Sequence, residues 1–312
     1  MKTPDIARLL VLAALWGASY LFMRVGAGEF GAVTMAGARA AGAAILLLPL
    51  LAARRDGSVR AMAGHWRPIV IVGLTNSALP FVLFSFAALS INASLSAIFN
   101  AATPLYAAVI GLLWLGQPIG KERALGLALG FAGVTWLVWD NAGFKTGPGS
   151  VATGWAVVAC VAATLLYAFA AHYSKQRVAD VPPLAVATGS QLVAALVLAI
   201  PALLLRPAVA PSPHAWAALA ALTVGCTAFA YVLFFRLIAN VGASRTMAVP
   251  FLVPAFGVLW PVLFLGEGVS WRLAAGSCLI VLGTALTTGV LGSARDSQHR
   301  AAPQRPGPVA ER

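Results

Sequence analysis

A run of 53 consecutive residues, from 68 to 120, contains no Asp, Glu, Lys or Arg. A helix that crosses the hydrocarbon core of a bilayer needs about 20 apolar residues, so this run is long enough to cross more than once. The whole chain has a similar character: 60% of its 312 residues are hydrophobic and 10% are charged, whereas soluble domains carry about 25% charged residues. The sequence therefore predicts a multi-pass membrane protein.

The chain also contains an internal repeat, because residues 81–133 align without a gap with residues 231–283, 150 positions later. The identities include Ala-Ser, a proline, Leu-x-Leu-Gly and two later glycines in one fixed order. The 13 identical pairs are Val82/Val232, Leu83/Leu233, Phe84/Phe234, Ala93/Ala243, Ser94/Ser244, Pro104/Pro254, Leu113/Leu263, Leu115/Leu265, Gly116/Gly266, Ala124/Ala274, Gly126/Gly276, Leu129/Leu279 and Gly133/Gly283. Upstream the alignment continues at an offset of 152, which pairs Gly37 with Gly189 and Arg39 with Gln191. A duplicated unit is the simplest explanation.

Apolar windows separated by polar or Pro/Gly breaks predict an all-α membrane protein with ten transmembrane helices. Their ranges are 6–26, 34–53, 68–90, 93–115, 121–139, 152–174, 184–205, 216–239, 243–265 and 271–291. We expect a first five-helix repeat in residues 1–140, a linker in 141–151, a second repeat in 152–292, and a disordered cytoplasmic tail in 293–312.

The positive charges predict the orientation of these helices. With a cytoplasmic N-terminus, 16 Lys and Arg residues fall on the cytoplasmic side and five on the other, as the positive-inside rule requires. Both termini are then cytoplasmic. Five helices per repeat is an odd number, so the second repeat enters the membrane from the opposite side and the two repeats are inverted.

The repeated motifs are similar to those of a known family. Ala93-Ser94, Pro104 and Leu115-Gly116-Gln117, with their second copies, resemble the EamA domain of the drug/metabolite transporter superfamily, and Trp16-Gly17 resembles its opening motif. The resemblance implies a ten-helix fold and export or exchange of small metabolites across the bacterial inner membrane. Gln117 departs from the family pattern, which usually has Glu there, whereas the second copy has Glu267.

Inverted repeats are typical of transporters, because two oppositely oriented copies can exchange conformations and open a midplane site to either side. A non-transporting receptor or scaffold with the same fold is the alternative.

Other functional classes are disfavoured by the sequence. A membrane enzyme is disfavoured because the four histidines are scattered and form no cluster with acidic residues. A channel is disfavoured because no filter-like segment is visible. A nucleic-acid partner is disfavoured because the basic residues only punctuate apolar segments. The three cysteines fit no metal-binding spacing, so no metal or cofactor is expected.

Polar and aromatic side chains inside the predicted helices are the candidates for substrate binding, because polar groups in a bilayer need partners or a wet cavity. Arg39 and its repeat mate Gln191 are both polar, which favours a cavity-facing position. The other candidates are Trp16, Ser19, Tyr20, Asn76, Asn100, Thr103, Tyr167 and Tyr231. Contacts between helices, snorkelling to the interface and lipid-facing aromatic belts are the structural alternatives.

Prolines and glycines are the candidates for hinges and close helix packing. Pro80 and Pro104 free a backbone carbonyl in their helices, and Pro250 with Pro254 is typical of a hinge or broken helix. Gly126, Gly130 and Gly133 form a small-residue face that allows close helix approach. This face predicts scaffold contacts, in a monomer or across a homodimer.

The acidic residues bear on energy coupling and on the substrate. All nine lie in predicted loops, helix ends or tails, so we expect no buried carboxylate that could carry protons. We therefore expect facilitated export or exchange. Glu267, near the outer end of the predicted helix 243–265, comes closest to an exception. A cavity that holds an arginine but no acid favours an anionic or zwitterionic substrate, such as an amino acid or a similar metabolite.

Overall fold

The computed structural model describes residues 3–141, 153–242, 246 and 248–289, and every regular element within these ranges is a helix. The first half contains α1 (Thr3–Phe30), α2 (Ala32–Ala52), α3 (Ser58–Gly64), α4 (Trp66–Gly73), η1 (Leu74–Ala78), α5 (Leu79–Ala87), α6 (Ala93–Ala101), α7 (Thr103–Leu115) and α8 (Lys121–Asn141). The second half contains α9 (Thr153–Arg177), α10 (Pro183–Leu204), α11 (Pro213–Ala220), η2 (Ala221–Phe229), α12 (Ala230–Val241), α14 (Val249–Leu265) and α15 (Trp271–Thr287).

Each predicted crossing overlaps one helix or a run of consecutive helices. Over the described residues, seven helical segments are long and apolar enough to cross a membrane, while α14 and α15 are apolar but shorter. The helix α8 begins with the charged triplet Lys121, Glu122 and Arg123. The predicted tail 293–312 lies outside the described residues, as does the predicted linker apart from Asn141.

Two of the long segments contain a π-helix, which the apolar pattern does not predict. η1 interrupts the segment Trp66–Ala87, and η2 interrupts the segment Pro213–Val241. The offset of 150 places η1 inside η2, so the irregularity is duplicated with the repeat. After η1, Pro80 has no N–H to donate to the Asn76 carbonyl, which rules out a regular α-helical bond there. Short π segments are frequent at functional sites.

A third segment is broken between α6 and α7 at Ala102. Pro104 cannot donate to the carbonyl of Asn100, and the hydroxyl of Thr103 donates to that carbonyl instead, at 2.7 Å. Pro250 and Pro254 behave differently, because Pro250 lies in the first turn of α14 and the helix continues through Pro254. The described part of the predicted range 243–265 therefore contains no break at either proline.

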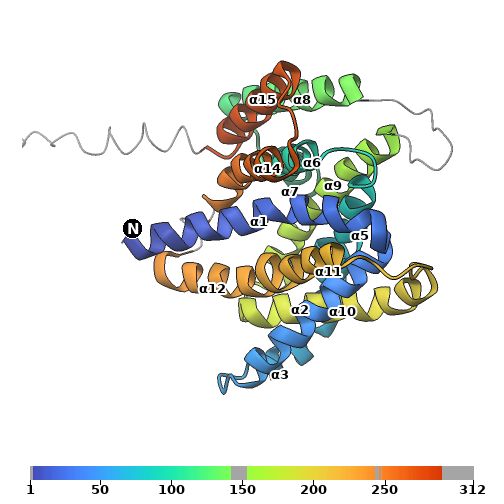
Figure 1. Ribbon diagram of the computed structural model, residues 1–312. Helices are drawn as coiled ribbons and strands as arrows, with labels where there is room; N and C mark the ends of the chain where they lie inside the picture. Colours follow the sequence, from blue (N-terminus) through green and yellow to red (C-terminus); the bar gives the residue numbers. More distant parts are fainter. Residues whose placement is uncertain (1–2, 142–152, 243–245, 247, 290–312) are drawn as a thin grey trace, which may run out of the picture.

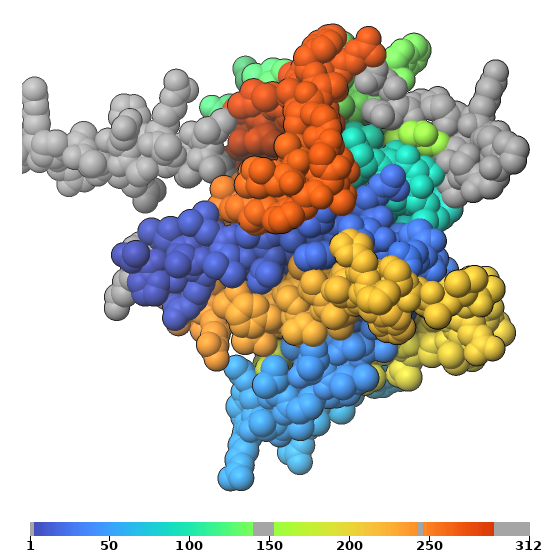
Figure 2. All heavy atoms as spheres, in the orientation of Figure 1, coloured from blue at the N-terminus to red at the C-terminus, as the bar shows by residue number. Residues whose placement is uncertain are grey.

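The two halves are interleaved. The repeat-equivalent helices α2 and α10 pack against each other, and α8 packs against α15 at the opposite edge of the bundle (Figure 1). Between these pairs, α1 contacts α14 of the second half, and α9 contacts α5 and α7 of the first half. In the space-filling view, α14 and α15 cover one side of α1, and α11 and α12 cover the other (Figure 2).

Glycines permit the closest helix contacts. A Cβ added to Gly126 would lie 2.6 Å from the backbone nitrogen of Thr287, and one added to Gly133 would lie 2.8 Å from Leu279 Cβ, both on α15. A Cβ on Gly130 would overlap Leu105 of α7. All three candidate glycines of α8 thus face helices of the same chain.

The duplicated Leu-Gly pairs end α7 and α14 in the same way. Gly116 and Gly266 adopt left-handed φ angles of 61° and 65°, a conformation that costs glycine little and commonly ends a helix. The residue after each glycine, Gln117 or Glu267, donates its backbone N–H to a carbonyl six residues earlier. The motif therefore fixes where each chain leaves its helix and where the side chains of Gln117 and Glu267 begin.

Candidate functional site

A cavity of about 310 Å³ lies between α4, η1, α9, α10 and α12. It extends to the turn that joins α9 and α10, and this end of the bundle is called the α9–α10 end below. The cavity walls are mainly apolar, with four polar side chains. The lining residues are Val72, Asn76, Ala170, Ala171, Ser174, Val178, Ala179, Val181, Pro183, Val186, Ala187, Ser190, Tyr231, Phe234 and Phe235.

We call the lining residues Asn76, Ser190 and Tyr231, together with the buried hydrogen-bonded cluster beside them, the cavity floor. The hydroxyls of Ser77 and Ser190 are 2.6 Å apart, and the Nε2 of Gln191 donates to Ser77 Oγ at 3.0 Å. Gln191 is fully buried, yet its Oε1 accepts no hydrogen bond from any described residue. A buried acceptor without a donor costs about 1–3 kcal/mol. Such a group in a native fold points to something that the protein itself does not supply.

Arg39 lies deeper than the cavity floor, as its partners on the neighbouring helices show. Its Nε donates to Thr227 Oγ1 at 2.9 Å, one turn before Tyr231, and its guanidinium carbon is 3.8 Å from the ring centroid of Phe81, one turn after Ser77. Its Nη1 is 3.9 Å from the sulfur of Met23. The side chain is buried, with 8% of the residue exposed.

None of the described residues in contact with Arg39 is an acid. The ion pairs among the described residues are Arg8–Asp5 and Arg54–Asp56. A buried charge without a counter-ion is expensive, and within membrane segments it usually marks a ligand or ion pathway. Arg39 is not among the residues that line the cavity, so its predicted cavity-facing role stays a prediction.

The candidate aromatic residues lie close to this region on three helices. The ring of Trp16 is 5.4 Å from that of Phe234, a wall residue of the cavity, and Tyr231 stacks on Phe235 at 6.0 Å. Tyr20 packs edge-on against Phe84, which stacks on Tyr167. Ser19 is buried, and its hydroxyl donates within α1 to the Leu15 carbonyl.

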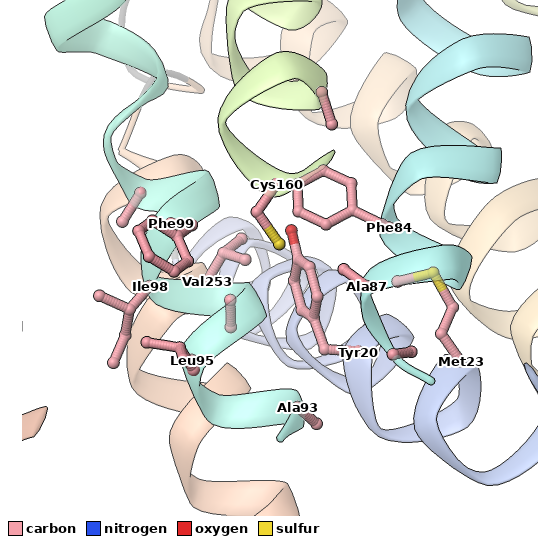
Figure 3. Close-up of a cluster of buried hydrophobic side chains, with 14 of the residues drawn as sticks. Tyr20, Met23, Phe84, Ala87, Ala93, Leu95, Ile98, Phe99, Cys160 and Val253 are labelled. Atoms are coloured by element: carbon pink, nitrogen blue, oxygen red, sulfur yellow. The ribbon is translucent and has the colours of Figure 1, made fainter. Parts of the chain in front are cut away.

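Beyond Arg39, away from the cavity, the side chains form a closed apolar core. Tyr20 projects from α1 toward Cys160 of α9 and Phe84 of α5, with Phe99 of α6 and Val253 of α14 nearby (Figure 3). These residues belong to one continuous cluster of buried side chains. The cluster separates the cavity from the end of the bundle that carries residues 88–92, called the α5–α6 end below.

Asn100 and Thr103 do not line this cavity. They lie at the α6–α7 break, where the Thr103 hydroxyl donates to the Asn100 carbonyl and lies 3.4 Å from its Oδ1. The structure thus brings Asn76, Tyr231, Gln191 and Arg39 together, whereas the Asn100 side chain lies beside another candidate, Tyr20.

Sequence reasoning missed a contact at the α5–α6 end. The carboxylate of Glu267, after the end of α14, accepts hydrogen bonds from the backbone N–H of Ala93 at 2.8 Å and of Ser94 at 3.1 Å, and from Ser94 Oγ at 2.7 Å. The Asn92 side chain accepts from Leu95 N, which completes the capping of α6. The sequence contains both parts of the contact, Ala93-Ser94 in the first copy and Glu267 in the second, but they are 173 or 174 positions apart and no local pattern pairs them.

One expectation about the acidic residues is wrong. Asp5 is buried, with 7% of the residue exposed. It lies in the first turn of α1, where it accepts from Arg8 at 2.7 Å and from Asn240 at 3.2 Å. The apolar pattern hides this burial because α12 covers the beginning of α1. The carboxylate is engaged at the beginning of α1, far along that helix from Met23, the α1 residue that contacts Arg39.

No group of three or more His, Cys, Asp or Glu side chains that could hold a metal ion occurs within the described residues. His172 belongs to no such group; its Nε2 contacts the Ala107 carbonyl at 2.7 Å, which makes Nε2 the protonated nitrogen.

Comparisons with known proteins agree with this architecture. The sequence model of the EamA-like transporter family matches residues 6–139 and 154–289. The chain is 24% identical over 288 residues to the uncharacterized transporter YvbV of Bacillus subtilis, with 90% of each chain covered. It is 26% identical over 298 residues to the uncharacterized inner membrane transporter YedA of Escherichia coli K12, which covers 91% of this chain and 90% of YedA.

A solved crystal structure has a similar fold, with a TM-score of 0.63 at 20% identity, covering 94% of this chain and 99% of the other. The family match covers both halves of the sequence, and the described helices supply the apolar spans that a membrane protein requires. The chain therefore belongs to the EamA-like transporter family and is a multi-pass membrane transporter of small molecules.

Proposed function

We propose that this protein is a secondary transporter that exports or exchanges a small metabolite across the bacterial inner membrane by alternating access. The proposal takes the ten predicted crossings as two inverted five-helix repeats, 1–140 and 152–292, with both termini in the cytoplasm. In this orientation the α9–α10 end faces the cytoplasm and the α5–α6 end faces outward.

The observation that carries the proposal is a cavity that reaches one end of the bundle while the other end is closed. The cavity extends to the α9–α10 turn. At the opposite end, the core around Tyr20 and Phe84 is packed, and Glu267 ties α14 to α6. A second tie at this end joins Arg24 to the Ala88 carbonyl at 2.6 Å. A carrier caught with its site open inward has these features.

The irregular segments lie where a carrier needs them. η1 supplies Asn76 to the cavity floor, and η2 supplies Thr227 to Arg39. Because π segments and proline breaks leave backbone groups without regular helical bonds, they allow local rearrangement at a low cost. Asn100 and Thr103 enter the proposal as part of the α6–α7 segment that rearranges, with Pro104 as its hinge. Pro80 is proposed as a hinge next to η1. Pro250 and Pro254 are proposed as hinges of α14, which is continuous in this structure.

Energy coupling follows from the charges in the site. The cavity lining contains no acidic residue, so we propose facilitated export or exchange in place of proton antiport through a carboxylate. Counterflow of labelled metabolites into proteoliposomes tests both points. We expect accumulation against preloaded unlabelled metabolite at a rate that an imposed pH gradient leaves unchanged. A rate that scales with the gradient would overturn the facilitated mechanism, and a lack of counterflow for every metabolite would overturn transport.

Thiol labelling tests alternating access. In a background with Cys160, Cys226 and Cys278 replaced by alanine, Ala171→Cys probes the cavity and Ile91→Cys probes the closed end. A metabolite that undergoes counterflow should lower the labelling of the first and raise that of the second. The exposed apolar residue Ile200 supplies a control, Ile200→Cys, whose labelling should not respond. Simultaneous labelling of both probes from both sides would indicate a channel.

A further inference from the structure

Two buried polar groups on the repeat-equivalent helices α2 and α10 have hydrogen-bonding capacity that the described residues do not use. A guanidinium has five N–H groups, and for Arg39 two of its nitrogens have partners, Thr227 Oγ1 and Met23 Sδ. Three N–H groups are left. Gln191 shows the complementary case, because its amide donates to Ser77 while its Oε1 accepts no bond. Arg39 thus offers positively charged donors, and Gln191 offers a neutral acceptor.

Tyr231 connects these two groups to the cavity. Its side chain neighbours Gln191, Asn76 and Ser77 and interacts electrostatically with Arg39. Tyr231 also lines the cavity together with Asn76 and Ser190. A ligand that enters from the α9–α10 end and displaces the Tyr231 side chain would therefore meet both Gln191 and Arg39.

We infer that Arg39 and Gln191 form a two-point site for a small monocarboxylate that carries an N–H or O–H donor next to its carboxylate. The inference rests on the proposed transport function and specifies its site. The planar guanidinium matches the two oxygens of a carboxylate, and Gln191 Oε1 accepts from the neighbouring amino or hydroxyl group. The ligand would thereby supply both the counter-ion and the donor that the protein lacks.

The charge and size of the site select this class over other anions. The cavity lining contains no charged residue, and Arg39 is the cation that acts electrostatically on the lining residue Tyr231, so one negative charge is neutralised and a phosphate dianion is not. A volume of about 310 Å³ is at the small end of ligand cavities, which span about 300–1,000 Å³. Apart from four polar side chains, the lining is apolar, for example at Val72, Val186 and Phe234, and suits a short hydrocarbon side chain.

A purely structural role for Arg39 would require groups that balance its charge. Its contacts are a hydroxyl, a thioether and a phenyl ring, and the phenyl ring compensates the charge only partly through its negative face.

Matched ligands test the proposal. The alanine, leucine and phenylalanine skeletons are each prepared in four forms: the amino acid, the 2-hydroxy acid, the acid without amino or hydroxyl group, and the amino amide. Each compound is measured as a stabiliser of the purified protein against thermal unfolding and as a competitor in proteoliposome counterflow. The variants are Arg39→Met, Arg39→Lys and Gln191→Leu. Arg236→Met, which removes an exposed arginine of α12, is the matched control.

We expect amino and hydroxy acids of at least one skeleton to bind wild type about tenfold tighter than the acid without a donor, and about 100-fold tighter than the amide. Arg39→Met should remove the preference for acid over amide, Arg39→Lys should restore part of it, and Gln191→Leu should remove the preference for the donor alone. Arg236→Met should keep both preferences.

Three results would overturn the inference. They are equal binding of acid and amide by wild type, an unchanged acid preference in Arg39→Met, and an unchanged donor preference in Gln191→Leu. If the amides then exchange in counterflow, the transport function stands and only the assigned site fails. If no compound binds and no metabolite of any class exchanges, the proposed function fails together with the inference.

Discussion

Glu267 and Ser94 join the two halves of the chain, because the carboxylate that follows α14 accepts both the backbone N–H and the hydroxyl of the second residue of α6. Together with the Ala93 N–H, this gives Glu267 three hydrogen bonds across 173 or 174 positions of sequence. A negative charge at a helix N-terminus is also favoured by the helix dipole. The contact is thus a defined interaction that opening of the α5–α6 end would have to break.

Glu267→Gln should weaken this contact, because an amide keeps one acceptor oxygen and loses the charge. We expect a loss of stability of about 1–2 kcal/mol in thermal unfolding and faster labelling of Ile91→Cys. Glu122→Gln, at an exposed position in the first turn of α8, is the control and should change neither quantity. Identical unfolding and labelling in Glu267→Gln and wild type would show that the tie does not hold this end closed.

Ser77→Ala should destabilise the floor of the cavity. Its hydroxyl pairs with Ser190 and accepts from Gln191 Nε2, so its removal leaves buried groups unpaired at a cost of about 1–3 kcal/mol. Ser277→Ala is the matched control, since the Ser277 hydroxyl bonds only within its own helix, to the Leu273 carbonyl. Equal melting temperatures for the two variants would contradict the cluster.

Gly283→Ala should separate α8 from α15. A Cβ at this position would overlap the backbone of Gly130, which cannot move without shifting the helix. Overpacking of this kind costs about 1–3 kcal/mol. Gly120→Ala adds the same methyl group where nothing lies within 4 Å and should be neutral. Thermal unfolding and the monodispersity of the purified protein measure the difference, and a neutral Gly283→Ala would show that the helices can move apart freely.

Pro104→Ala should make the α6–α7 segment more regular. Alanine restores a backbone N–H that can donate to the Asn100 carbonyl. In the wild-type protein this carbonyl accepts a hydrogen bond from the Thr103 hydroxyl. If the break is used during transport, counterflow should slow while the melting temperature rises. Pro118→Ala in the exposed turn after α7 controls for loss of a proline elsewhere. An unchanged exchange rate would remove Pro104 from the set of proposed hinges.

Much of the architecture could be predicted from residues alone. The charge-free run and the repeat located the helices because apolar length and Gly/Pro punctuation are local properties. Arg39 and Gln191 could be singled out because a polar side chain deep in an apolar helix is rare, and the repeat showed that their positions correspond. The structure places both in the buried region beside the cavity.

Other features depend on contacts that the sequence does not encode locally. η1 and η2 keep the apolar pattern of a helix, so hydropathy does not distinguish them from α-helix. The bond from Arg39 to Thr227 spans 188 positions, and no local pattern pairs these residues. Glu267 stands out in the sequence only as the carboxylate nearest to a predicted helix, because its partners, two backbone N–H groups and the Ser94 hydroxyl, lie 173 or 174 positions away. Asn100 and Thr103 were polar enough to be chosen, but the Thr103 hydroxyl bonds to the Asn100 backbone carbonyl and the Asn100 side chain lies beside Tyr20.

The capping of α6 by Glu267 has a consequence for the energy of the two conformations. Perfectly identical inverted repeats would give inward-open and outward-open states of equal energy, because exchanging the repeats converts one state into the other. The chain breaks this degeneracy where the repeat has Glu267 in one copy and the exposed, uncharged Gln117 in the other. In the proposed orientation, the α5–α6 end carries this charged contact on the outside and the equivalent inner position does not. If transport follows the proposed alternating access, we therefore expect the empty carrier to rest open to the cytoplasm.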